Sequence, residues 1–100
     1  DFKLINFKKK NFKIPHMGFN KVKDYNNFSL TKNIEKNYFY FAHSYYAKKK
    51  ILSKDISYLE CCYGDKFIAG IEKENFFGLQ FHPEKSQSNG IKVLENFYKL

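Results

Sequence analysis

The sequence contains no arginine and no tryptophan, and only two cysteines, two prolines and one methionine among its 100 residues. All 18 basic residues are therefore lysines, and the formal net charge is +8. Clustered positive charge attracts nucleic acid, but base edges and phosphates favour the planar guanidinium fork of arginine. Ten asparagines accompany the lysines, so we attribute the charge to a bias towards Lys and Asn and expect the lysine runs 8–10 and 48–50 to be solvated loops. This composition disfavours a nucleic-acid-binding module.

The two cysteines, Cys61 and Cys62, are adjacent. This spacing suits neither a C-x-x-C redox motif nor a four-ligand zinc site. The surrounding residues 58–62 alternate like a strand, so at least one thiol should face inward and both cysteines should be reduced packing residues. A nucleophilic cysteine is expected on a Gly-rich elbow, and the sequence contains no such elbow.

Long hydrophobic runs are also absent. No segment is long enough to span a bilayer, and residues 1–10 lack the basic-then-apolar order of a signal peptide. We therefore expect a cytoplasmic protein that does not bind a membrane. The hydrophobic content of 43% can form one small core, which predicts one domain or part of one. Because the first residue is Asp1 rather than Met, we expect a truncated chain.

Four segments rich in aromatic and β-branched residues lie between turn signals and predict strands. They are residues 38–42, 56–62, 67–72 and 76–81. Short turns at Gly64-Asp65 and Glu74-Asn75 join the last three segments. Such turns leave no room for helical crossovers, so these strands should be antiparallel neighbours.

The C-terminus shows a different period. Ile91, Leu94, Phe97 and Tyr98 recur at spacings of three and four, which predicts an amphipathic helix that packs back on the sheet, with Ser88 or Asn89 as its cap. A strand, a polar loop and a helix are typical of the end of an open α/β fold. Ligands bind beyond the carboxyl ends of strands in such folds, which directs attention to the residues after strand 76–81.

A His-Pro-Glu sequence occupies this position. Pro83 disfavours helical geometry at His82, so His82 and Glu84 should lie in an extended segment and project to the same side. The carboxylate could then hold the tautomer of the imidazole while the other ring nitrogen serves a nucleophile. A surface pair or a metal site could use the same two residues, so the spacing alone leaves these alternatives open.

The neighbouring residues identify a family. Residues 81–86, FHPEKS, resemble the F-H-P-E-K-S signature of class I glutamine amidotransferases. Residues 15–20, PHMGFN, are similar to P-H-M-G-W-N, and residues 38–46, YFYFAHSYY, to Y-F-Y-F-V-H-S-Y-Y. The P-H-M-G segment points within this class to the glutaminase subunits of imidazole glycerol phosphate synthase. The resemblance implies an α/β fold in which residues 1–100 are the C-terminal half of one flavodoxin-like domain, with antiparallel strands and a terminal helix, and in which the N-terminal half with the nucleophilic cysteine is absent.

The resemblance also implies roles for individual residues. His82 would be the general base and acid, Glu84 would orient it, and residues around His43, Ser44 and Tyr45 would hold the glutamine substrate. The implied reaction is hydrolysis of the glutamine side-chain amide through a cysteinyl thioester, without a cofactor or a metal. The ammonia would pass to a cyclase (synthase) subunit, in a heterodimer that acts in histidine biosynthesis.

Three further residues match positions that face the partner subunit in this family: Phe19, Tyr40 and Lys85. We expect them to cluster near His82. Phe19 stands where the family has Trp, which leaves open a paralogue that supplies ammonia for another acceptor, such as a surface sugar. A catalytically inactive fragment is the other alternative. Without the resemblance, His16 would be expected to make a structural hydrogen bond and His43 to be a satisfied core histidine.

Overall fold

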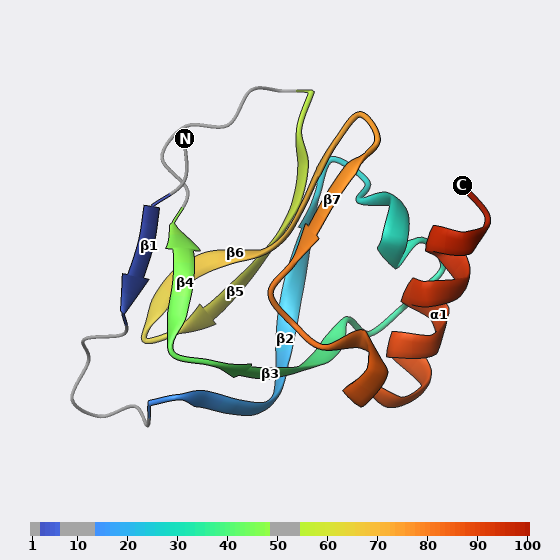
Figure 1. Ribbon diagram of the computed structural model, residues 1–100. Coiled ribbons are helices and arrows are strands. Elements are labelled where there is room, and N and C mark those ends of the chain that lie inside the picture. Colours follow the sequence, from blue (N-terminus) through green and yellow to red (C-terminus); the bar gives the residue numbers. More distant parts are fainter. Residues whose placement is uncertain (1–2, 7–13, 49–54) are drawn as a thin grey trace.

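The computed structural model describes residues 3–6, 14–48 and 55–100. These residues form seven strands, two 3-10 turns and one α-helix (Figure 1). The strands are β1 (Lys3–Asn6), β2 (His16–Tyr25), β3 (Tyr38–His43), β4 (Tyr45–Lys48), β5 (Ser57–Tyr63), β6 (Asp65–Lys73) and β7 (Phe76–Leu79). The 3-10 turns are η1 (Ser29–Thr31) and η2 (Pro83–Lys85), and the helix is α1 (Gln87–Tyr98).

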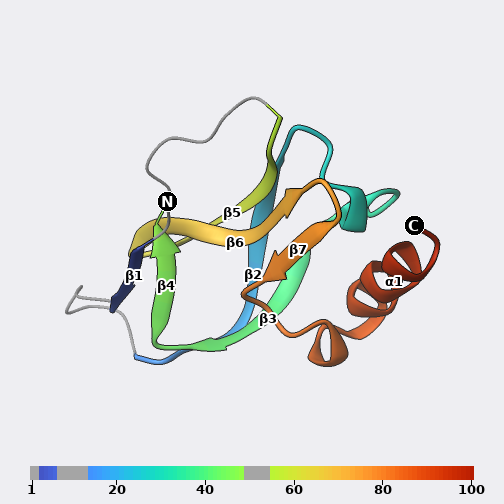
Figure 2. The ribbon, with the colours of Figure 1, turned by 45° about the horizontal axis from the view of Figure 1, so that its top comes forward.

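The strands form one antiparallel sheet in the order β1-β4-β6-β5-β2-β3, with β7 beside β6. Only Ser44 separates β3 from β4 along the chain, although β3 lies at one end of this order and β4 near the other. The sheet therefore curls on itself, and β3 turns directly into β4 at a sharp corner (Figures 1 and 2). Aromatic side chains dominate the enclosed core, which includes Phe39, Phe41 and Phe67.

The sequence predicted four of these strands. Segments 38–42, 56–62, 67–72 and 76–81 correspond to β3, β5, β6 and β7, although β7 ends at Leu79. The antiparallel pairing of β5, β6 and β7 is confirmed. Strands β1, β2 and β4 were not predicted. Lys48 is the last residue of β4 rather than part of a loop, and the other residues of the two lysine runs lie outside the described residues.

The predicted C-terminal helix is confirmed as α1, but its cap and its buried face differ from the prediction. The N-cap is Ser86, and Ser88 and Asn89 lie inside the helix. The buried residues of α1 are Gly90 and Val93. The apolar residues behind the prediction are at least half exposed: Ile91, Leu94, Phe97 and Tyr98. The helix docks through a close backbone approach at Gly90, so its large side chains do not decide which face is covered.

Helix α1 lies beside η1 and η2 (Figure 2). The ring of Phe97 meets the ring of Phe77 on β7 edge to face, with centroids 5.9 Å apart. None of the described residues belongs to a helix long and apolar enough to cross a membrane.

Candidate active site

His82 and Glu84 lie side by side in the turn between β7 and α1. His82 has extended backbone angles, as predicted, and Pro83 begins η2. Glu84 lies within this 3-10 turn and not in an extended segment, which corrects the sequence-based expectation. The turn still brings Nδ1 of His82 to 3.0 Å from Oε2 of Glu84. Because the carboxylate accepts a hydrogen at Nδ1, the neutral imidazole carries its lone pair on Nε2.

The charge state of Glu84 suits this contact. A hydrogen bond from its own backbone N–H, followed by the hydrogen bond with His82, lowers the pKa of the Glu84 carboxyl. The group is therefore a carboxylate at neutral pH and can stabilise a protonated imidazole. The side chains of His82 and Glu84 are 38% and 62% exposed, so a reacting group can reach the pair from outside this chain.

A buried hydroxyl fixes the backbone of His82 against β3. Ser86 is 2% exposed, and its Oγ donates to the carbonyl of His82 at 2.7 Å and accepts from the backbone N–H of Tyr40 at 2.9 Å. The N–H of His82 in turn donates to the carbonyl of Tyr40 at 2.9 Å. Both backbone polar groups of His82 are thereby tied to one residue of β3. This role of Ser86 was not predicted from the sequence, where its place in the FHPEKS segment was the available signal.

Gly90 allows α1 to approach this turn closely. A Cβ atom at Gly90 would lie 1.7 Å from the carbonyl oxygen of Pro83 and 3.0 Å from Cβ of Ser86. The N–H of Gly90 donates to the carbonyl of Ser86 at 3.3 Å. A residue with any side chain would therefore separate the helix from the turn that carries His82. This role of Gly90 was not predicted from the sequence, because the contact forms only when the helix packs on the turn.

The three residues predicted to bind substrate form the corner between β3 and β4. His43 ends β3, Ser44 makes the corner, and Tyr45 begins β4 with an exposed side chain. Nδ1 of His43 donates to the carbonyl of Tyr45 at 2.8 Å. Burial is the main cause that lowers the pKa of His43, and the nearby charge of His82 contributes. The corner and the His82–Glu84 pair are thus neighbours along β3. His43 is also a buried, hydrogen-bonded histidine, as its apolar surroundings predicted.

The three residues predicted to face a partner subunit lie together. Phe19 on β2 pairs with Tyr40 on β3 in the strand register, and their rings meet edge to face with centroids 5.5 Å apart. Nζ of Lys85 lies 5.9 Å from the centroid of the Tyr40 ring. Because the carbonyl of Tyr40 also accepts a hydrogen bond from the backbone N–H of His82, this cluster adjoins the candidate catalytic pair.

The two cysteines of the chain differ in their exposure. Cys61 is buried and Cys62 is exposed, and both are free thiols. This confirms that at least one thiol faces inward, but the expectation that both cysteines are packing residues is wrong for Cys62. Burial, reinforced by Cys62, raises the pKa of Cys61 to about 12, so this thiol stays protonated at neutral pH. Across residues 3–6, 14–48 and 55–100, no three side chains of His, Cys, Asp or Glu gather where they could hold a metal ion.

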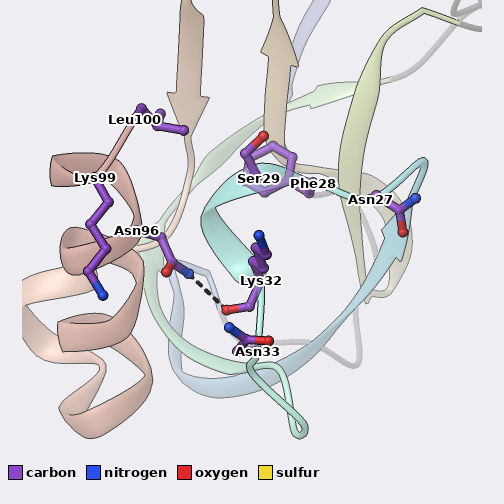
Figure 3. A pocket seen from close by; sticks show the side chains of 8 residues that line it. All are labelled: Asn27, Phe28, Ser29, Lys32, Asn33, Asn96, Lys99 and Leu100. Carbon is purple, nitrogen blue, oxygen red and sulfur yellow. Dashed lines mark hydrogen bonds between the residues drawn. The ribbon is translucent and has the colours of Figure 1, made fainter.

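A separate pocket of about 590 Å³ lies between η1 and the C-terminal end of α1 (Figure 3). Its lining residues are Asn27, Phe28, Ser29, Lys32, Asn33, Asn96, Lys99 and Leu100. Nδ2 of Asn96 donates to the carbonyl of Lys32 at 2.9 Å and to that of Leu30 at 2.9 Å, which ties the helix to η1. The residues that line this pocket include no acid, histidine or cysteine.

Known proteins resemble this chain over most of its length. The chain is 45% identical over 91 residues to "Imidazole glycerol phosphate synthase subunit HisH 1" of Campylobacter jejuni strain RM1221, a match that covers 90% of the chain and 44% of that protein. It is 46% identical over 103 residues to "Imidazole glycerol phosphate synthase subunit HisH 2" of Methanococcus maripaludis, covering 97% of the chain and 48% of that protein. The chain therefore spans about half the length of these relatives. The family described as "Glutamine amidotransferase class-I" matches residues 5–100, and the chain belongs to this family.

Proposed function

We propose that this chain carries the general base and its orienting carboxylate for a glutaminase, and that the ammonia released from glutamine goes to the cyclase subunit of imidazole glycerol phosphate synthase. The observation that carries the proposal is the 3.0 Å contact between Nδ1 of His82 and Oε2 of Glu84. This contact lies on the turn that the family motif forms, and Ser86 ties that turn to β3. The proposal includes a heterodimer that acts in histidine biosynthesis in the cytoplasm.

Each residue of the pair has a defined task in this reaction. Nε2 of His82 takes the proton of a cysteine thiol that lies outside these 100 residues, and the thiolate attacks the side-chain carbonyl of glutamine. A C–S bond forms, the C–N bond breaks, and His82 returns the proton to the departing nitrogen as ammonia leaves. Water then attacks the thioester, and His82 accepts the water proton and passes it to the thiolate, which releases glutamate. Glu84 holds the ring orientation and stabilises the imidazolium in both steps.

The corner at Ser44 provides the substrate side of this proposal. It lies at the end of β3, the strand that also holds the backbone of His82 through Tyr40. The exposed Tyr45 and the backbone of the corner can contact the polar end of a bound glutamine. The side-chain amide of that glutamine would then extend towards His82.

The test uses a protein that joins this chain to the remainder of the domain and measures glutamate release. His82→Ala should lower kcat by about 10²- to 10⁴-fold, because proton transfer is lost at both steps. Glu84→Gln should be less damaging, because a usable but poorly oriented imidazole remains. Glu95→Gln is a matched control, since Glu95 is an exposed residue of α1. Equal activity of wild type and His82→Ala would reject the proposed triad, and the 100-residue chain alone should release no glutamate.

Phe19 supports a second candidate function. The family that the sequence resembles has Trp where this chain has Phe19. This position adjoins Tyr40 in the predicted partner surface. A different ring at an interface can accompany a different partner, so a paralogue that supplies ammonia for amidation of a surface sugar is the alternative. Stimulation of glutamate release by the cyclase subunit would favour the leading proposal. Lack of both binding and stimulation would favour the alternative.

A further inference from the structure

Two buried histidines face each other across β2 and β3. His16 and His43 are paired in the strand register and are 2% and 9% exposed. Nδ1 of His16 lies 2.9 Å from Nε2 of His43. One imidazole therefore donates a hydrogen bond to the other, and the direction of donation depends on their tautomers.

The flanking contacts determine this direction. The carbonyl of Tyr45 can only accept, so Nδ1 of His43, 2.8 Å away, carries a hydrogen. The neutral ring of His43 then has its lone pair on Nε2 and accepts from Nδ1–H of His16. Nε2 of His16 is left with a lone pair and accepts from Nδ2 of Asn20 at 3.4 Å. A one-way chain of hydrogen bonds runs from Asn20 through both rings to the carbonyl of Tyr45.

The surroundings keep both rings neutral and oriented. Burial, with a contribution from His43, lowers the pKa of His16 to about 4. Burial also lowers the pKa of His43. The ring of His16 stacks on Tyr63 with centroids 3.9 Å apart and on Phe41 with centroids 4.9 Å apart. These contacts hold the imidazole planes, so the chain of hydrogen bonds has one defined geometry.

We propose that His16 and His43 are positioning residues that hold the Ser44–Tyr45 corner in the one conformation that fits glutamine. The proposal rests on the proposed glutaminase function and assigns to His16 a role in substrate positioning. His43 captures the carbonyl of Tyr45, and His16 orients His43. Neither ring moves a proton in the reaction. The corner consists of a single residue between two strands, so loss of one N–H donor lets it relax away from the substrate.

The first experiment measures steady-state glutamine hydrolysis by the full-length protein that contains this chain. His16→Phe keeps a ring that can stack on Tyr63 but loses the donor to His43. It should raise KM for glutamine by about tenfold, the loss expected for one buried hydrogen bond, and change kcat by about twofold at most. His16→Asn places an amide N–H near the lost Nδ1–H and should recover part of the affinity. Unchanged KM in His16→Phe, or a kcat loss as large as that of His82→Ala, would overturn the positioning role.

The second experiment needs no turnover and reads the tautomers directly. Imidazole nitrogen NMR of the same protein near neutral pH should show His16 and His43 both neutral, protonated at Nδ1 and unprotonated at Nε2. A ring protonated at Nε2 would overturn the proposal even if the enzyme is active. If the expected tautomers are found but wild type does not hydrolyse glutamine, the proposed function fails and the role of the two histidines in glutamine binding fails with it. Failure of the positioning role therefore shows in the tautomers, whereas failure of the proposed function shows in the absence of glutamine hydrolysis.

Discussion

Replacing Gly90 with alanine should push helix α1 and the η2 turn, which carries His82, apart. The new Cβ would lie 1.7 Å from the carbonyl oxygen of Pro83 and 2.7 Å from its carbonyl carbon. Side-chain Cβ atoms essentially never approach another heavy atom closer than 3.0 Å. The helix and the turn must therefore separate by about 1.3 Å, the difference between 3.0 and 1.7 Å. The obstacle is backbone, so no side-chain rotation can relieve it.

Three energies decide the outcome for stability. Alanine is favoured over glycine in a helix by about 1 kcal/mol. Forced overpacking costs about 1–3 kcal/mol or more. Separation also strains the hydrogen bond from the N–H of Gly90 to the carbonyl of Ser86, which is worth about 1 kcal/mol. The two losses exceed the gain, and we expect the free energy of unfolding to fall by about 1–3 kcal/mol.

The effect on catalysis should be similar in free energy to the effect on stability, since a loss of rate of about 10²-fold corresponds to about 2.7 kcal/mol. A misplacement of about 1 Å can cost about 10²-fold in rate, and Ser86 transmits the shift to the backbone of His82. Urea denaturation followed by circular dichroism measures the first effect, and glutamate release by the folded protein measures the second. Gly78→Ala is the control, because its new Cβ would meet side chains and no backbone: Cγ2 of Ile71 at 3.2 Å and Cε2 of Phe76 at 3.8 Å. A Gly90→Ala protein as stable as wild type, or more stable, would refute the close approach.

Three further predictions concern other parts of the chain. The pKa of His16 falls from 6.5 to about 4 on folding, so the unfolded chain binds a proton at His16 at a higher pH than the folded chain does. The free energy of unfolding should therefore fall by on the order of 3 kcal/mol as the pH drops from 6.5 to about 4. Urea titrations at several pH values should show this dependence, and it should shrink in His16→Phe. Lys85→Ala should weaken binding of the cyclase subunit by about 1–5 kcal/mol or uncouple its stimulation, whereas the exposed Lys92→Ala should not; unchanged affinity and stimulation would remove Lys85 from the interface. Of the two cysteines, only Cys62 is exposed, so Cys62→Ser should remove one site that reacts fast with a thiol reagent, and Cys61→Ser should remove none. Equal loss of fast-reacting sites in both variants would contradict the placement of β5.

Local patterns predicted the strands whose turns and alternation lie close together in the sequence. Strands β5, β6 and β7 are joined by short turns at Gly64-Asp65 and Glu74-Asn75, and Gly, Asp and Asn are residues that favour turns. Strand β2 was missed because polar residues occupy much of it, and its place comes from hydrogen bonds to β3 and β5. Pairing between distant strands leaves little trace in a short window of sequence.

The sequence by itself determined the family and the candidate catalytic pair. His82 and Glu84 are two residues apart, and the proline between them limits the backbone, so their approach is a local property. Only the tertiary structure decided what supports them. His16 and His43 are 27 residues apart in sequence, and Ser86 and Tyr40 are 46 apart. These pairs meet because β2 adopts one register on β3 and because Gly90 lets α1 touch the turn. Register and close backbone approach depend on the whole curled sheet, since a shift of one residue would turn each side chain to the opposite face.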